Sequence, residues 1–138
     1  MRGNANLPSA AGIGADCQFS YPALPKKLSA EEVDHYVGLL RAHDLVAATT
    51  SADDVAHTKP APDIFKAALD KTGVAALAAM VVGDTPYDVE AAARCGVAAI
   101  GLLSGGFAES VLREAGAVAI YNDVAALLAG FEGSPLAG

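Results

Sequence analysis

The stretch that most constrains the fold is a short apolar run that ends in glycine and leads into an acid and a helix start. It reads Val81-Val82-Gly83-Asp84-Thr85-Pro86. The apolar run is typical of a buried strand, Thr85 is a favourable N-cap, and proline suits the first position of a helix. A strand that turns directly into a helix delivers the Asp84 side chain to the carboxyl edge of a parallel sheet, where ligands bind.

The rest of the chain from Asp44 onward alternates strand and helix signals. Strands are predicted over 45–49, 79–82, 97–102 and 118–121, and the helices between and after them are expected to stop at Gly73, Gly96, Gly116 and Gly130. Asn122 is expected to cap the last helix. This β-α alternation predicts an α/β fold, a three-layer α/β/α Rossmann-like arrangement around a mostly parallel sheet.

The N-terminal part of the chain looks different. Residues 1–28 are rich in Gly, Ala, Pro and Ser and are expected to be irregular, residues 29–133 to form the α/β core, and residues 134–138 to form a tail. Ser29 to Glu32 has the pattern of a capping box, which predicts a helix to about Arg41. Its apolar stripe contains Val33, Tyr36, Val37 and Leu40, and the last three of these are expected to face the core.

Composition excludes several functions. The 138 residues are 53% hydrophobic and carry a net charge of −7, which argues against nucleic acid or an anionic membrane as partner. The apolar run over 74–82 is too short to span a bilayer, and the start of the chain lacks the apolar region of a secretory signal. The separate cysteines Cys17 and Cys95 fit a reducing cytoplasm better than a disulfide scaffold.

Three residues are candidates for chemistry. Asp84 and Asp88 are four positions apart at a helix start, so both can face one cation, and Mg²⁺ prefers a few carboxylates together with water and phosphate. Asp88 equally suits a simple capping pair with Thr85. Lys59 precedes Pro60, which favours an extended loop, and it could contact a phosphoryl oxygen or be a solvated surface lysine.

The other polar residues are interpreted as structural or solvated. Asp53, Asp54 and His57 are expected to be loop residues, and His35 and His43 lack the spacing of a zinc site. Ser104-Gly105-Gly106 lacks a phosphate-loop pattern and is interpreted as an ordinary loop between strand and helix.

Two motifs together resemble a known family. Lys59-Pro60-x-Pro62-Asp63-Ile64-Phe65 followed by Val82-Gly83-Asp84-Thr85-x-x-Asp88 is similar to the haloacid dehalogenase (HAD) superfamily, in its phosphoglycolate-phosphatase and β-phosphoglucomutase-like branch. The resemblance runs from about Glu31 to Leu128. It implies a Mg²⁺-dependent phosphatase acting on a small phosphorylated metabolite, with Lys59 steadying the nucleophile and phosphate, and Asp84 and Asp88 holding the metal.

Two motifs of that family are not evident. The nucleophile normally lies in a D-x-D-G-T sequence after an N-terminal strand, but no D-x-D occurs before Lys59, and Asp16 is only a weak candidate. The hydroxyl motif, a Thr or Ser after the next strand, is not evident either, and little remains for a substrate-selecting cap. The resemblance therefore implies a sheet without its nucleophile strand, an open sheet edge, and weak or no turnover.

Two other interpretations stay open. The chain could be a non-catalytic α/β domain that uses its acidic rim or open sheet edge for a protein partner, including a second copy of itself. A phospho-receiver domain is a more distant alternative, because it would place its acids differently. The sequence does not identify the substrate.

Overall fold

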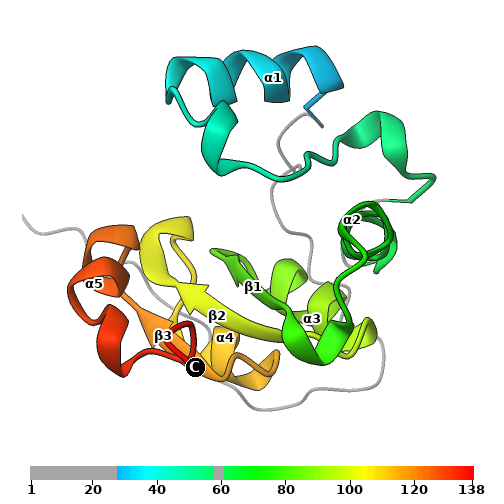
Figure 1. The fold of residues 1–138 in the computed structure, drawn as a ribbon. Helices are drawn as coiled ribbons and strands as arrows, with labels where there is room; N and C mark the ends of the chain where they lie inside the picture. The colour runs from blue at the N-terminus through cyan, green and yellow to red at the C-terminus, as the bar shows by residue number, and fades with distance from the viewer. Residues whose placement is uncertain (1–27, 58–60) are drawn as a thin grey trace, which may run out of the picture.

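The computed structural model describes residues 28–57 and 61–138, and its core is a parallel sheet flanked by helices (Figure 1). Within those residues the strands are β1 (Met80–Gly83), β2 (Ala98–Leu102) and β3 (Ala119–Tyr121), in the order β1-β2-β3. The helices are α1 (Ala30–Leu39), α2 (Asp63–Thr72), α3 (Pro86–Arg94), α4 (Glu109–Glu114) and α5 (Val124–Ala129). Short 3₁₀ turns cover His43–Leu45, Ala52–Asp54, Ala76–Ala78, Leu103–Gly105 and Phe131–Gly133. The predicted α/β fold with a parallel sheet is confirmed.

One face of the sheet packs on α2, α3 and α4. The buried cluster there contains Val89 and Ala92 of α3, Ala99 of β2 and Leu112 of α4, with Val97 just before β2. Phe65 and Leu69 of α2 pack against this cluster. A β-carbon on Gly101 of β2 would lie 3.0 Å from Leu112 Cδ1, so the strand and helix are in close contact.

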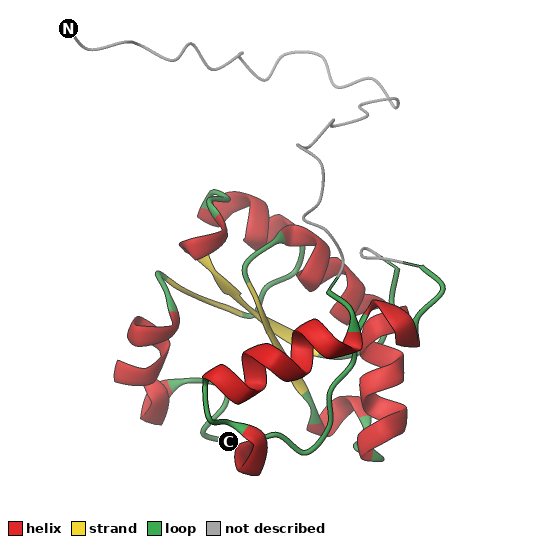
Figure 2. Cartoon of the chain, turned by 90° about the horizontal axis from the view of Figure 1, so that it is seen from above, coloured by secondary structure: helices red, strands yellow, loops and turns green. Residues whose placement is uncertain are grey.

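The opposite face is covered unevenly. Ile100 of β2 is fully buried, whereas its register partner Val82 of β1 is 41% exposed. Near β3 the cover comes from α5, because its C-cap Gly130 lies beside the ring of Tyr121. Figure 2, which views the chain from above, shows helices on both sides of the sheet. Among residues 28–57 and 61–138, the three-layer arrangement is therefore complete near β3 and open near β1.

The predicted strand over 45–49 is wrong. His43–Leu45 forms a 3₁₀ turn, and Val46 is extended but belongs to no strand. Leu45 is 86% exposed, so this segment lies outside the apolar core. A strand needs a neighbour to accept and donate its backbone hydrogen bonds, and none lies beside this segment among the described residues.

Helix α1 forms where expected but does not pack as expected. Ser29 and Glu32 make the predicted capping box, with Ser29 Oγ accepting from the Glu32 amide at 3.3 Å and Glu32 Oε2 accepting from the Ser29 amide at 2.8 Å. No residue of α1 is buried, and the expected core residues Tyr36 and Leu40, the latter just after the helix, are exposed. In Figure 1 the helix stands apart from the sheet.

Most predicted helix boundaries are confirmed. Gly73, Gly96 and Gly116 adopt positive φ angles at or just after the ends of α2, α3 and α4, which suits glycine because it has no β-carbon. The expected N-cap of α5 is shifted by one residue. Asp123, not Asn122, caps this helix, with Oδ1 accepting from the Ala126 amide at 2.7 Å.

No helix among the described residues has the length and apolar character that a membrane span requires.

Candidate functional site

Asp84 is the first residue after β1 and lies at the carboxyl edge of the sheet. Asp84 is half-buried, and the next residue, Thr85, is the N-cap of α3. Pro86 occupies the first turn of α3, as the sequence indicated. Because β2 runs parallel to β1, the turn Leu103–Gly105 that follows β2 lies at the same edge.

Asp88 and Thr85 form a reciprocal capping pair. Asp88 Oδ2 accepts hydrogen bonds from the Thr85 amide at 3.2 Å and from Thr85 Oγ1 at 2.8 Å, and Thr85 Oγ1 accepts from the Asp88 amide at 3.2 Å. Asp88 is only 5% exposed. The capping role considered for Asp88 is therefore present, and its metal-binding role stays a prediction.

Two glycines lie in close contact with Asp84 and Asp88. A β-carbon on Gly83 would lie 2.8 Å from Asp88 Cγ and 2.9 Å from Asp88 Oδ2, so the Asp88 side chain occupies the space above this glycine. A β-carbon on Gly105 would overlap the carbonyl oxygen of Asp84. The sequence around Gly105 predicts an ordinary loop, and only the structure reveals how closely Gly105 approaches the distant Asp84.

The third candidate, Lys59, lies outside the described residues, as does Asp16. Lys59 therefore stays a predicted phosphate contact. His57, two residues before Lys59 in the sequence, pairs with Asp63, the first residue of α2. Asp63 Oδ2 is 2.9 Å from His57 Nδ1 and accepts from the His57 amide at 3.2 Å.

This His57–Asp63 pair was not anticipated. The hydrogen bond from the His57 side chain is the main reason that the pKa of Asp63 lies below its ordinary value. The imidazole is exposed and is tied to the start of α2. A histidine six residues before a helix-opening acid is too weak a sequence signal to predict such a pair.

Asp54 is the second acid with an unanticipated partner. Its Oδ1 is 2.7 Å from Lys71 Nζ of α2, and the same ammonium donates to the Thr49 carbonyl at 2.8 Å. The Lys71 hydrogen bond is the largest cause of a pKa for Asp54 below its usual range. These contacts attach the segment before His57 to α2 and leave Asp54 with a structural role.

The chemistry of the donor set fits a partial magnesium site. Asp84 and Asp88 offer carboxylate oxygens, which Mg²⁺ prefers, and this ion commonly takes only one or two protein carboxylates and completes its shell with water and phosphate. Across residues 28–57 and 61–138, no three His, Cys, Asp or Glu side chains gather closely enough to hold a metal by themselves. A cation here would therefore need ligands beyond these residues.

Comparison with known proteins identifies the family. A family model described as haloacid dehalogenase-like hydrolase matches residues 26–102. A phosphoglycolate phosphatase from Rhodospirillum rubrum is 36% identical over 84 residues, which cover 61% of this chain and 34% of that protein. The chain thus spans about a third of the length of this curated relative.

Solved structures agree with the fold. The crystal structure of a hydrolase from Pseudomonas syringae is 36% identical with a TM-score of 0.62, and the match covers 73% of this chain and 48% of that one. A HAD family hydrolase from Deinococcus radiodurans, with bound phosphate and sodium, has a TM-score of 0.66 at 20% identity, covering 79% and 50% of the two chains. At that identity the second likeness shows the fold alone. The chain belongs to the haloacid dehalogenase-like hydrolase family.

Proposed function

We propose that this chain carries the metal-binding part of a Mg²⁺-dependent phosphatase that acts on a small phosphorylated metabolite. The observation that carries the proposal is the position of Asp84, directly after β1 and beside the capped N-terminus of α3, with Asp88 one turn away. The phosphoglycolate phosphatase among the relatives supports a small phosphate ester as the substrate class.

The three proposed residues divide between metal binding and phosphate binding. Asp84 and Asp88 would hold Mg²⁺ through carboxylate oxygens, and Lys59 would contact a phosphoryl oxygen as a point charge. When bound, the metal would neutralise charge on the phosphate. The capping bonds of Asp88 fix its carboxyl group before any ligand arrives, which reduces the entropy lost on binding.

Turnover by this chain is expected to be weak or absent. Phosphoryl transfer through an aspartyl intermediate needs a nucleophilic carboxylate, and no D-x-D motif precedes Lys59 in the sequence. The loss of a nucleophile typically costs several orders of magnitude in rate.

The test measures Mg²⁺ binding and p-nitrophenyl phosphate hydrolysis separately. Titration calorimetry should show Mg²⁺ binding that Asp84→Asn abolishes and that Asp70→Asn, an exposed substitution on α2, leaves intact. Equal binding by wild type and Asp84→Asn would refute the metal assignment. Robust hydrolysis that Asp84→Asn abolishes would show that a nucleophile is present, and Asp16→Asn would then locate it.

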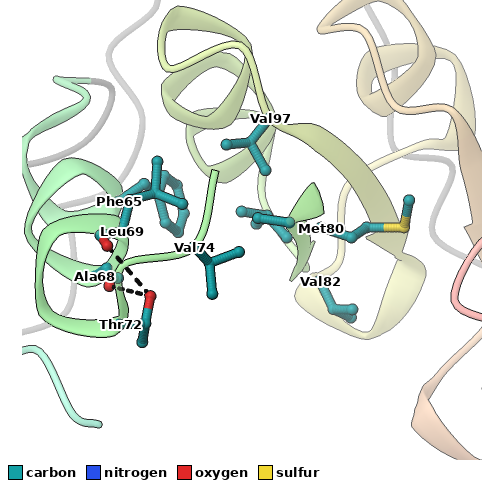
Figure 3. A pocket seen from close by; sticks show the side chains of 10 residues that line it. Phe65, Ala68, Leu69, Thr72, Val74, Met80, Val82 and Val97 are labelled. Atoms are coloured by element: carbon teal, nitrogen blue, oxygen red, sulfur yellow. Dashed lines mark hydrogen bonds between the residues drawn. The ribbon is translucent and has the colours of Figure 1, made fainter. Parts of the chain in front are cut away.

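A second candidate function is association through β1, which is an edge strand of the sheet in the described part of the chain, and we infer a second copy of this chain as the partner. An apolar groove of about 430 Å³ runs between α2 and β1 (Figure 3). It is lined by Phe65, Ala68, Leu69, Thr72, Val74, Ala79, Met80, Val81, Val82 and Val97. The four residues of β1 include no charge and no proline, the usual devices that protect a sheet edge.

Charge favours a symmetric antiparallel pairing of two β1 strands. If Met80 of one copy lies opposite Gly83 of the other, the two Asp84 residues fall about 17 Å apart along the strands, at 3.4 Å per residue. This exceeds the screening length of about 8 Å at physiological salt, so the acids would not repel strongly. Light scattering should show a dimer that Val82→Lys dissociates and that Leu128→Lys, at an exposed position of α5, does not. A monomeric wild type would refute the proposed dimer.

We also propose a cytoplasmic location, which the free thiol of Cys95 supports because such thiols persist in reducing compartments. Fractionation of cells that produce the chain would test it.

A further inference from the structure

We propose that Gly105 is a positioning residue for Asp84. Because Gly105 has no side chain, the turn after β2 closes directly on the Asp84 backbone and fixes the direction of the Asp84 carboxylate. This inference rests on the proposed function, in which that carboxylate binds Mg²⁺.

The contact is too close for any other residue. Besides overlapping the Asp84 carbonyl oxygen, a β-carbon on Gly105 would lie 2.8 Å from the Asp84 carbonyl carbon and 3.0 Å from its β-carbon. These are backbone and β-carbon atoms, so no flexible side-chain end can move aside. An alanine at 105 must displace either the turn or Asp84 itself.

The contact with Gly105 matters because Asp84 lies between the end of β1 and the capped start of α3. The last paired residue of β1 is Gly83, which lies in register with Gly101, so Asp84 is one residue past the ladder. On its other side, Thr85 is fixed by the capping pair with Asp88. Asp84 is thus the single link between the strand and the helix cap, and the turn at Gly105 packs against that link.

The turn itself supplies a matched control. Gly106 caps the same 3₁₀ turn, and its amide donates to the Leu103 carbonyl at 3.0 Å. Gly106 has a φ of +82°, so alanine there strains the turn, but a β-carbon on it would meet no atom within 4 Å. Gly105 does not have a positive φ, so alanine at 105 acts through its close contact with Asp84 and not through a left-handed backbone.

The experiment uses the whole chain, with Mg²⁺ as the probe. Backbone NMR without metal should show that Gly105→Ala shifts the amide signals of Asp84 and Thr85 more than Gly106→Ala does. Gly105→Ala should weaken Mg²⁺ binding about 10-fold or more, the usual effect of losing a group that orients a metal ligand. Gly106→Ala should lower stability and leave the Mg²⁺ affinity of the folded protein unchanged.

The possible failures are distinguishable. If wild type does not bind Mg²⁺, the proposed function fails and the positioning role fails with it. If wild type binds and Gly105→Ala binds equally well, or if both glycine variants weaken binding equally, only the positioning role is overturned. If Gly105→Ala does not fold, Mg²⁺ should still shift the Gly105 amide in wild type but not in Asp84→Asn, and an unresponsive Gly105 amide would overturn the proposal.

Discussion

The side chain of Asp88 occupies the space in which a β-carbon on Gly83 would lie. Gly83 is the last residue of β1 and Asp88 is in the first turn of α3, so this contact sets how closely the helix start approaches the strand end. The glycine is needed for space, because its φ is not positive. In the Gly83-Asp84-x-x-x-Asp88 motif, the second acid therefore packs on the glycine.

Replacing that glycine should destabilise the fold. Gly83→Ala places a methyl group against Asp88, and overpacking of this kind typically costs about 1–3 kcal/mol in the free energy of unfolding. Urea denaturation would measure the loss. Gly133→Ala is the matched control, because a β-carbon there meets nothing within 4 Å. Equal stabilities of the two variants would contradict the steric account.

The Thr85 hydroxyl should matter through the helix cap. Its oxygen accepts from the Asp88 amide and its proton reaches Asp88 Oδ2, so Thr85→Ala removes both bonds. We expect a loss of about 1 kcal/mol, the usual cost of deleting an N-cap hydroxyl. Thr85→Ser keeps the hydroxyl and should restore most of the stability in the same denaturation experiment. A serine variant as unstable as the alanine variant would show that the methyl group, and not the cap, is responsible.

The pair of Asp54 and Lys71 predicts a pH dependence with a definite sign. The folded pKa of Asp54 lies below its ordinary value, chiefly because Lys71 donates a hydrogen bond to it. The carboxylate therefore contributes stability above the ordinary aspartate pKa of about 4, and this contribution is lost as the pH falls through the lowered folded value.

Lys71→Met removes the cause of the shift. NMR titration of the carboxyl carbons should show the pKa of Asp54 rising toward its ordinary value in this variant. Lys66→Met, an exposed substitution on the same helix, should leave that pKa unchanged. An unaltered Asp54 titration in Lys71→Met would contradict the assigned cause.

Local signals predicted the elements whose neighbours are close in the sequence. The cap at Thr85, the proline at Pro86 and the glycine stop at Gly96 together bounded α3, since each acts within one helical turn. The strands around Val81 and Ile100 were predicted because the parallel partner of each follows after a single helix. Here local preference and tertiary packing agree.

The predictions from sequence were wrong where burial of a segment depends on distant parts of the chain. The apolar residues over 45–49 have a strand-like composition, but the described sheet ends at β1 and offers them no place. Helix α1 is likewise amphipathic, but none of its residues is buried within the described part of the chain. The site shows the same division: the Thr85–Asp88 pair was predictable from its spacing, whereas the approach of Gly105 to Asp84 joins turns 21 residues apart and leaves no pattern in the sequence.

Leu112 packs α4 against the sheet in the hydrophobic core. Leu112 is fully buried, its side chain lies beside Gly101 of β2, and it belongs to the buried cluster against which Ala117, just before β3, packs. Leu112→Ala should therefore leave a cavity that the rigid strands cannot close, at a cost of about 2–5 kcal/mol in the free energy of unfolding. Leu128→Ala, the same change at a 73% exposed position of α5, should cost no more than about 0.5 kcal/mol. Chemical denaturation of both variants measures the difference, and a similar small loss in each would show that α4 does not pack on the sheet as described.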